Sequence, residues 1–279
     1  MAKSIVLITG CSSGFGMLSA ARLAAAGHTV YATLRDLTKQ ERLLKETARR
    51  GTEVKILPLD VTDDASIAPV VARITEEHGK LDVLVNNAGY GLGGAFEDLL
   101  EAEFRAQMET NFFGVLKMIR NCLPLLRRSS AAKIINLSSI AGLSGIPGLS
   151  AYNASKFALE GFSEALSHEL AVFGISVTLI EPGSYQTDVQ KNSRLAQNFY
   201  NPDSPYLEYS KRLLASTQRR VARRDGNPED IAGLIERVIN TQKPAMRYIA
   251  GRDARVLRFL HRTLPFGAYS RFLNRVLSR

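Results

Sequence analysis

Tyr152 and Lys156 stand four residues apart at the end of the segment 133–156, KIINLSSIAGLSGIPGLSAYNASK. If a helix begins near Ser150, the two side chains project from one face of it, which puts an ammonium beside a phenol. A free tyrosine has a pKa of about 10 and is a poor acid or base at neutral pH, but a nearby positive charge lowers that value. The pair therefore suits general acid and base chemistry, although Tyr-x-x-x-Lys alone also arises by chance in many helices.

A glycine-rich turn near the N-terminus offers a second kind of chemistry. The apolar run Ile5 to Ile8 predicts a strand buried on both faces, and Gly10, Gly14 and Gly16 separate it from an alanine-rich helix that ends at Gly27. The N-terminus of such a helix offers unpaired N–H groups and the positive end of the helix dipole, and so binds a pyrophosphate. The spacing Gly-x-x-x-Gly-x-Gly differs from the commonest dinucleotide fingerprint, and an ordinary turn between strand and helix is the alternative.

The end of the second predicted strand bears on the choice between NAD and NADP. A carboxylate there commonly holds the ribose 2'-hydroxyl of NAD, whereas the 2'-phosphate of NADP calls for arginine. The residues present are Leu34, Arg35 and Asp36. Arg35 favours NADP, while Asp36 keeps NAD open if the strand register moves by one residue. A solvated turn would also place charges here.

Alternating strands and helices must position these residues. Such an alternation, with buried strands, predicts a single α/β domain with a Rossmann-type doubly wound parallel sheet of about seven strands and helices on both faces. The polar segment 184–227 interrupts the rhythm and is predicted to be an insertion over the site. We expect an NAD(P)-binding domain over 1–251 and a basic amphipathic tail over 252–279. The expected strands are 5–8, 28–34, 54–59, 81–85, 134–137 and 175–180, and the expected helices after the first are 38–50, 63–78, 97–109, 111–128, 150–173 and one from about 228.

The composition is that of an ordinary globular protein apart from its charge. Of the 279 residues 45% are hydrophobic, which allows a sizeable core, and the net charge is +9. An anionic cofactor, an acidic membrane surface or nucleic acid would suit that charge, as would a merely basic exterior. Cys11 and Cys122 match no ligand spacing and the four histidines form no metal-like group, so no metal site is predicted. We find no signal peptide or membrane-spanning run and expect a reducing, cytoplasmic location.

Further motifs follow one another in a fixed order over residues 4–190. They are Thr9-Gly10-x-x-x-Gly14-x-Gly16, Leu59-Asp60-Val61, Asn86-Asn87-Ala88-Gly89, Thr110-Asn111-Phe112-Phe113-Gly114, Ser139, Tyr152-x-x-x-Lys156, and Pro182-Gly183 with Thr187. With them the chain resembles the short-chain dehydrogenase/reductase superfamily, classical type. The segments 9–14, 31–36 and 155–161 resemble its 17β-hydroxysteroid and retinol dehydrogenase-like branch, which varies freely at the position of Ser184-Tyr185-Gln186.

The resemblance implies an oxidoreductase that interconverts an alcohol and a carbonyl. Tyr152 would exchange a proton with the substrate oxygen, and Ser139 would hydrogen-bond the same oxygen, because fixed donors stabilise an alkoxide as it forms. Lys156 would bind the nicotinamide ribose and lower the pKa of the tyrosine, and Asn111 would hold a water that links the lysine to solvent. The residues that the resemblance assigns to the cofactor are Gly10, Ser12, Ser13, Gly14, Phe15, Gly16, Arg35, Asp60, Val61, Asn87, Ala88, Gly89, Tyr152, Lys156, Pro182, Gly183 and Thr187.

Several of these residues also have a structural role open to them. Asn111 could cap a helix, and Ser139 could sit in a turn at the end of its strand. Asp60 could cap a turn, and Thr187 could begin the next helix. If the set is structural throughout, the chain is a catalytically silent dinucleotide-binding sensor or a membrane-surface scaffold, although a sensor has no need to keep all four residues of the catalytic set.

The predicted pocket walls indicate a lipophilic substrate, such as a steroid, a retinoid, a fatty ketone or a xenobiotic ketone. They are mainly apolar or aromatic, as in most ligand pockets. In the resembled family the helices at 111–128 and 152–173 commonly pair across a two-fold axis, which implies a homodimer or a larger homo-oligomer. The expected walls are 90–92, 143–149, Tyr185, Val189, Leu195, Phe199 and Tyr206.

The tail 252–279 contains seven arginines and one aspartate. Its apolar residues recur at helical spacing, and Pro265 divides it into two short amphipathic helices. Such a tail could dock on its own domain, on a partner subunit or, as a peripheral contact, on an anionic membrane. No interleaving of aromatic and basic residues on a sheet is visible, so nucleic acid is not expected as a partner.

Overall fold

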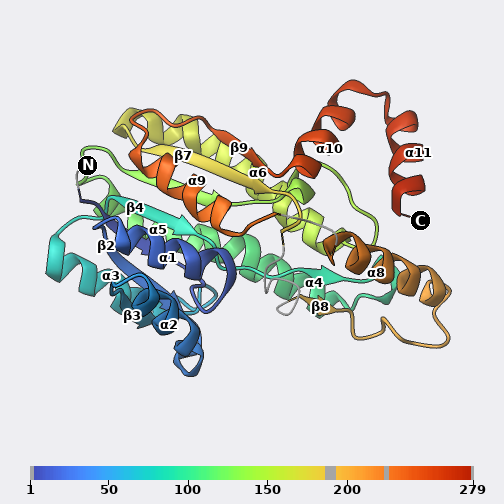
Figure 1. Cartoon of the computed structure of the whole chain (residues 1–279), viewed down its shortest axis with the longest axis horizontal. Coiled ribbons are helices and arrows are strands. Elements are labelled where there is room, and N and C mark those ends of the chain that lie inside the picture. The colour runs from blue at the N-terminus through green and yellow to red at the C-terminus, as the bar shows by residue number, and fades with distance from the viewer. Residues whose placement is uncertain (1–2, 186–192, 223–225, 278–279) are drawn as a thin grey trace.

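A seven-stranded parallel sheet forms the centre of the molecule in the computed structural model, which describes residues 3–185, 193–222 and 226–277. Its strands run in the order β3-β2-β1-β4-β6-β7-β9 (Figure 1). The chain therefore starts near the middle of the sheet and winds outward in both directions, which confirms the predicted doubly wound fold. The strands are β1 (Ile5–Ile8), β2 (Thr29–Leu34), β3 (Lys55–Pro58), β4 (Val83–Asn86), β6 (Lys133–Leu137), β7 (Ser176–Pro182) and β9 (Arg247–Ala250), and β5 (Leu92–Gly93) pairs separately with β8 (Arg194–Leu195).

Helices cover both faces of this sheet (Figure 1). On one face α1 packs against α9, and on the other α3, α5 and α6 lie against the strands. The helices are α1 (Gly14–Ala25), α2 (Glu41–Arg49), α3 (Asp64–His78), α4 (Glu101–Met108), α5 (Gly114–Leu126), α6 (Ser150–Leu170), α8 (Leu207–Ala222), α9 (Glu229–Asn240), α10 (Arg252–Thr263) and α11 (Phe266–Leu277), with short turns at η1 (Leu37–Lys39), η2 (Phe96–Asp98), η4 (Ile140–Gly142) and η5 (Ala171–Phe173).

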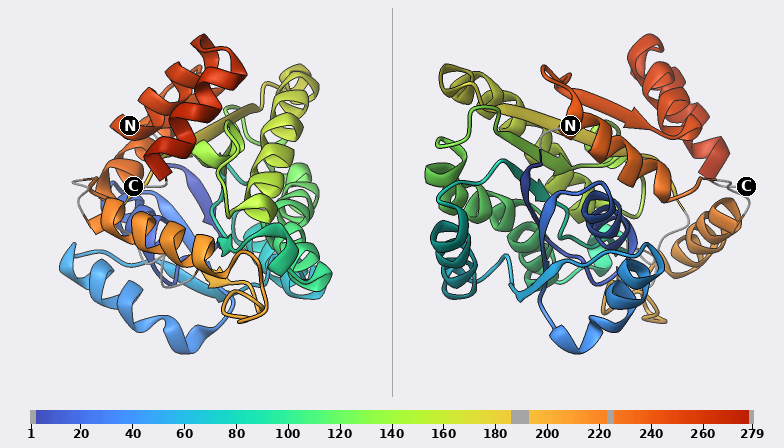
Figure 2. Two further views of the ribbon diagram at one scale, coloured as in Figure 1. Left: turned by 90° about the vertical axis from the view of Figure 1, so that its right-hand side faces the viewer. Right: turned by 60° about the vertical axis from the view of Figure 1, so that its left-hand side comes forward.

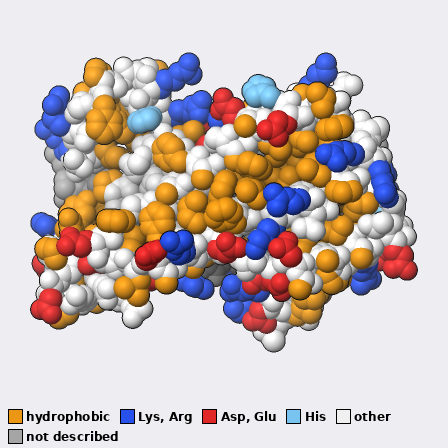
Figure 3. All heavy atoms as spheres, turned by 180° about the vertical axis from the view of Figure 1, so that it is seen from behind, with side chains coloured by type: hydrophobic (Ala, Val, Ile, Leu, Met, Phe, Trp, Pro, Cys, Tyr) orange, Lys and Arg blue, Asp and Glu red, His pale blue; other side chains and the backbone are white. Residues whose placement is uncertain are grey.

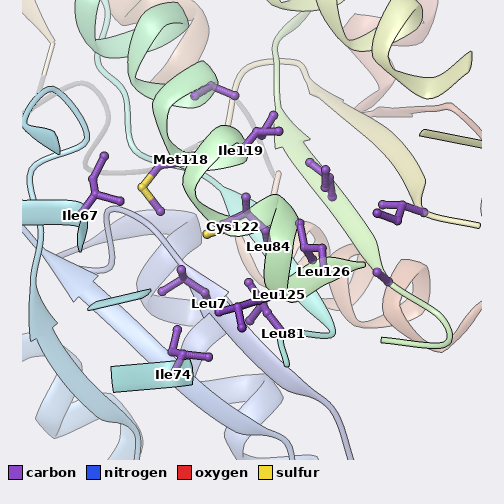
Figure 4. Close-up of a cluster of buried hydrophobic side chains, with 14 of the residues drawn as sticks. Leu7, Ile67, Ile74, Leu81, Leu84, Met118, Ile119, Cys122, Leu125 and Leu126 are labelled. Atoms are coloured by element: carbon purple, nitrogen blue, oxygen red, sulfur yellow. The ribbon is translucent and has the colours of Figure 1, made fainter. Parts of the chain in front are cut away.

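Successive strand residues point to opposite faces and so build two hydrophobic cores. Leu7 and Leu84 belong to the core beneath α3 and α5, whereas Ile8 and Val85 belong to the core beneath α1 and α9. Figure 4 shows the first core, in which side chains of α3 and α5 meet those of β1 and β4. Because both faces are covered, strands such as β1 and β4 can be apolar on both sides, which is why Ile5 to Ile8 appears in the sequence as a continuous apolar run.

The segment between β4 and β6 differs from the prediction. The sequence predicts separate helices at 97–109 and 111–128, but α4 and α5 are joined by a π-helical turn, η3 (Glu109–Phe113). Asn111 lies inside this turn and is buried, so the alternative that it caps a helix is wrong. Single π-helical turns inside helices are frequent at functional sites.

The C-terminal part of the chain completes the sheet and adds a helical hairpin. The sequence predicts about seven strands but places six; the seventh is β9, at the sheet edge beside β7. The two short helices expected in the tail are α10 and α11, with Pro265 between them. Figure 2 shows them at one end of the molecule, near α8. None of the described helices is both long enough and apolar enough to cross a membrane.

Candidate active site

The glycine turn after β1 is packed tightly against the end of β4. Gly10 has φ +73°, and a Cβ there would lie 2.8 Å from the Cα of Ala88. A Cβ on Gly16 would lie 2.4 Å from Nδ2 of Asn87, which donates to the carbonyls of Thr9 and Gly10. The predicted Asn87 and Ala88 thus lie directly against the turn, and only glycine fits at both turn positions.

The start of α1 fits an anionic group. Ser13 is its N-cap residue, and the first turn contains no acidic side chain that would oppose a negative charge near the exposed N–H groups. The point lies beside the boundary between β1 and β4, where the order of the sheet reverses and dinucleotides bind in such folds. Glycine turn, helix end and sheet edge together fit the pyrophosphate of a dinucleotide.

The residues expected near the adenosine differ in how they are engaged. Asp36 accepts hydrogen bonds from the backbone and the hydroxyl of Thr38 and pairs with Lys39, so it caps the turn after β2. Asp60 likewise accepts from the backbone and the hydroxyl of Thr62, so the turn-capping role is present for this residue. Arg35 follows β2 directly and is exposed.

Ser139, Tyr152 and Lys156 come together from two elements. Ser139 is the N-cap residue of η4 beyond the end of β6, and it lies near enough to Tyr152, in the first turn of α6, to lower the pKa of that phenol. The Lys156 ammonium lies over the face of the Tyr152 ring, with Nζ 5.8 Å from the ring centroid, and donates to the carbonyl of Leu137 at 2.7 Å. The predicted i and i+4 placement on one helix face is therefore present.

The pKa of Tyr152 differs from the prediction. The sequence predicts that Lys156 lowers the pKa of Tyr152, but burial raises the pKa of the phenol above its ordinary value, and the hydrogen bond with Ser139 opposes that shift. Burial also lowers the pKa of Lys156 to about 8, against the attraction of Glu160. The Lys156 ammonium lies over the face of the Tyr152 ring and donates its hydrogen bond to a backbone carbonyl and not to the phenol oxygen.

Asn111 ties three segments together. Its Oδ1 accepts from the N–H of Tyr90 at 3.1 Å, and its Nδ2 donates to the carbonyl of Tyr90 at 2.9 Å and to Oγ of Ser155 at 3.3 Å. The side chain thereby bridges the loop after β4 and helix α6, and Gly89 packs against it.

The loop after β7 is fixed by a residue that the sequence analysis missed. Asp253, in the first turn of α10, accepts from the N–H of Ser184 at 3.0 Å, and a Cβ on Gly183 would lie 2.3 Å from its Oδ1. A lone aspartate among arginines gave no signal of this contact. Tyr185 packs edge-on against Phe15, while the predicted Thr187 and Val189 lie outside the described residues.

A buried charge cluster lies on the far side of Lys156. The Arg247 Nε is 3.1 Å from Glu160 and 3.3 Å from Glu181, and Arg258 of α10 is 3.5 Å from Glu181. Glu181 is fully buried, and burial, with Glu160 second, raises its pKa to about 7. The cluster links the catalytic helix α6 to strand β7 and to the tail.

An apolar cavity of about 480 Å³ is lined by Ile140, the residue after Ser139, and by Leu149, three residues before Tyr152, while Ser139 and Tyr152 are not among its lining residues. The predicted walls Ile146 to Leu149, Leu195 and Phe199 are among its lining residues. Within the described chain Tyr90, Tyr185 and Tyr206 do not line it. The sequence analysis missed the walls contributed by α8, α10 and α11, which are Leu213, Leu214, Val256, Leu257, Phe272 and Leu273.

Known proteins share this architecture and its sequence pattern. Residues 4–198 match the short chain dehydrogenase family. The chain belongs to this family. Its members in the comparison include the uncharacterized oxidoreductase YusZ of Bacillus subtilis, 40% identical over 99% of both chains, and the 3-ketodihydrosphingosine reductase of Bacteroides thetaiotaomicron, 39% identical over 92% of this chain and 91% of the relative. Human retinol dehydrogenase 8 is 38% identical over 88% of this chain and 81% of its own, which confirms the expected branch.

Solved structures of short chain dehydrogenases have the same fold as this chain. One from Streptomyces avermitilis superposes with a TM-score of 0.81 at 33% identity, covering 98% of this chain and 96% of that one. A metagenomic member in complex with NADP has a TM-score of 0.69 over 88% of this chain and 96% of its own, and one from Burkholderia phymatum in complex with NAD has 0.80 over 92% of both; each is 26% identical. The chain is therefore an NAD(P)-dependent oxidoreductase acting on CH–OH groups.

The charge cluster predicts a pH dependence of stability. Because the folded state raises the pKa of Glu181 from 4.5 to about 7, it binds that proton more tightly than the unfolded chain, and stability falls as pH rises between these values. Glu181→Gln should reduce the difference in the free energy of unfolding between pH 5 and pH 8 by about 1 kcal/mol or more, measured by urea unfolding. Glu164→Gln is the matched control, since Glu164 pairs with the same Arg247 but has a lowered pKa. If the free energy of unfolding changed with pH in the same way for wild type and Glu181→Gln, this account would be ruled out.

Proposed function

We propose that the protein is an NADP(H)-dependent reductase or dehydrogenase of a lipophilic ketone or alcohol, with Ser139, Tyr152, Lys156 and Asn111 as its catalytic set. The observation that carries the proposal is the meeting of Ser139, Tyr152 and Lys156 near an apolar cavity of about 480 Å³. A cavity of that size suits a ligand of steroid or retinoid dimensions. The bound nicotinamide would supply or accept the hydride.

The roles of the residues follow from their positions. The Tyr152 hydroxyl gives its proton to the carbonyl oxygen during reduction and takes it from the alcohol during oxidation. Ser139 donates a hydrogen bond to the same oxygen while charge develops on it. Lys156 supplies positive charge beneath the phenol, and Asn111 holds the loop at Tyr90 and the π-helical turn in place.

The direction of the pKa shift favours reduction near neutral pH. A phenol whose pKa burial has raised keeps its proton there and can donate it. Oxidation needs the phenolate, so its rate rises with pH. The Lys156 ammonium, whose pKa burial lowers to about 8, loses its charge at lower pH than the phenol loses its proton.

The preference for NADP rests on Arg35. Asp36, the acidic alternative, is occupied in its own turn by Thr38 and Lys39. Arg35 is exposed at the end of β2 and carries a guanidinium suited to a phosphate. The structural relatives include both an NADP and an NAD complex. The choice between the two cofactors is therefore tested by measuring the affinity of this protein for each.

Partners and location are also part of the proposal. A homodimer is expected through the face of α5 and α6, where Figure 3 shows a band of hydrophobic side chains and where Phe113 and Phe157 are each 45% exposed. A catalytically silent sensor is the competing function, and turnover of any ketone or alcohol in the screen below would exclude it. A cytoplasmic location stays a prediction.

Tyr152→Phe should bind NADPH almost as tightly as wild type but lose turnover by about 100-fold to 10,000-fold, because it removes the proton donor alone. Binding is measured by fluorescence titration of NADPH, and turnover by NADPH absorbance in a screen of hydroxysteroids, retinoids and aliphatic ketones. Tyr90→Phe is a control that removes a nearby phenol outside the proposed catalytic set. Near-normal turnover of Tyr152→Phe at saturating substrate would overturn the assignment.

Arg35→Ala should weaken NADPH binding by about tenfold to 100-fold and leave NADH binding nearly unchanged, because only NADPH carries the 2'-phosphate. Dissociation constants for both cofactors, measured at one fixed salt concentration, test this. Lys39→Ala, which removes a positive charge a few residues away, serves as the control. An unchanged preference between the two cofactors in Arg35→Ala would reject the role of Arg35.

A further inference from the structure

The hairpin of α10 and α11 has a clear inward face. Leu257, Leu260 and Leu264 pack with Tyr269 and Leu273 of α11, and Leu213 of α8 joins them. Asp253 and Arg258 attach the hairpin to the loop after β7 and to Glu181. The hairpin therefore docks on its own chain, and its orientation is fixed by these contacts.

The hairpin also exposes large apolar side chains to solvent. Val256 is 56% exposed, Phe259 64% and Phe266, at the start of α11, 78%. Val256 and Phe259 are three residues apart and form a stripe along α10, beside the packed leucines, and Phe266 lies beyond Pro265 at the start of α11. Exposed aromatic rings are costly in water and suit an apolar environment.

Basic residues flank that stripe. Arg252, Arg255 and Arg262 on α10 and Arg271 and Arg275 on α11 are exposed. Asp253, the one acidic residue of the sequence 252–279, is turned inward to the N–H of Ser184. The surface is therefore positive with an apolar centre, which matches an anionic headgroup layer above acyl chains and not a nucleic acid, whose bases would need a stacking platform.

The same stripe borders the substrate cavity. Val256 of α10 and Phe272 of α11 line the cavity, and both are also exposed to solvent. Figures 1 and 2 show the hairpin at the end of the molecule that carries α8, which forms another wall. A molecule dissolved in the layer beneath this surface could enter the cavity between the helices without crossing water.

We propose that the outward face of α10 and α11 docks on an anionic lipid surface and that the cavity takes its lipophilic substrate from that surface. The choice of substrate rests on the proposed function, whereas the docking does not. Each exposed arginine raises affinity for an anionic surface by about fivefold, and the phenylalanines add apolar burial.

Vesicle co-sedimentation of the full chain tests the docking without any use of activity. Wild type should bind vesicles of phosphatidylglycerol and phosphatidylcholine mixed, should bind pure phosphatidylcholine much more weakly, and should be released by salt. Arg255→Glu with Arg262→Glu, and Phe259→Ser with Phe266→Ser, should each weaken binding by about tenfold or more. Lys3→Glu with Lys243→Glu, and Val172→Ser, are controls at exposed positions on other elements.

Activity then tests the route of entry. With a short, water-dissolved ketone all variants should keep wild-type kcat/KM, which also shows that they fold. With a long-chain ketone embedded in the mixed vesicles, the two tail double variants should lose about tenfold or more in kcat/KM, and the controls should not.

Negligible binding of wild type to the anionic vesicles would overturn the proposal. Binding of both tail double variants that is as tight as that of wild type would overturn it as well. Tighter binding to a mixed-sequence DNA duplex, unaffected by Phe259→Ser with Phe266→Ser, would assign the surface to nucleic acid instead. Dissociation of an oligomer by that same double variant in size-exclusion chromatography would assign it to a second copy of the chain. Vesicle binding without turnover of any ketone would leave the docking standing and refute the proposed function.

Discussion

A buried ammonium beside a partly buried phenol is the constraint on which the site depends. Lys156 is 7% exposed, and the hydrogen bond of its Nζ goes to the backbone carbonyl of Leu137. Burying a charge is costly unless opposite charge or hydrogen bonds offset it. Here Glu160, one turn further along α6, supplies the opposite charge, and Arg247 and Glu181 continue the alternation of charges behind it. The catalytic lysine is thus embedded in a network that spans α6, β7, β9 and the tail.

This network explains why distant parts of the chain meet at one place. Strand β6 must end at Leu137 to offer its carbonyl, and α6 must begin at Ser150 to bring Tyr152 to Ser139. The tail reaches the same region twice, through Arg258 at Glu181 and through Asp253 at Ser184. The helical hairpin therefore supports the loop after β7 while it forms a wall of the cavity and presents its outer face to the surroundings.

The sequence predicted those parts of this structure that follow from local pattern. Continuous apolar runs such as Ile5 to Ile8 fixed the buried strands, and the glycines at 10, 14 and 16 marked the turn, because backbone geometry there admits few other residues. The spacing of Tyr152 and Lys156 placed both on one helix face. The seventh strand, 247–250, is short and follows a proline-containing turn, so no pattern located it.

Contacts between residues far apart in sequence could not be predicted. Nothing local distinguishes Asp253 or Glu181 from surface carboxylates, and their roles depend on which elements the fold brings together. The direction of the Tyr152 pKa shift is another such case, since burial, its largest cause, depends on the whole structure. The π-helical turn at Asn111 has no sequence signal that separates it from an ordinary helix.

The pH profile of alcohol oxidation tests the central claim most directly. The account holds that Ser139 lowers the pKa of a phenol whose pKa burial has raised. In Ser139→Ala the rising limb of kcat/KM for oxidation should therefore move to higher pH than in wild type, beyond the general loss of rate. A limb that stays at the wild-type pH, or moves to lower pH, would contradict the account.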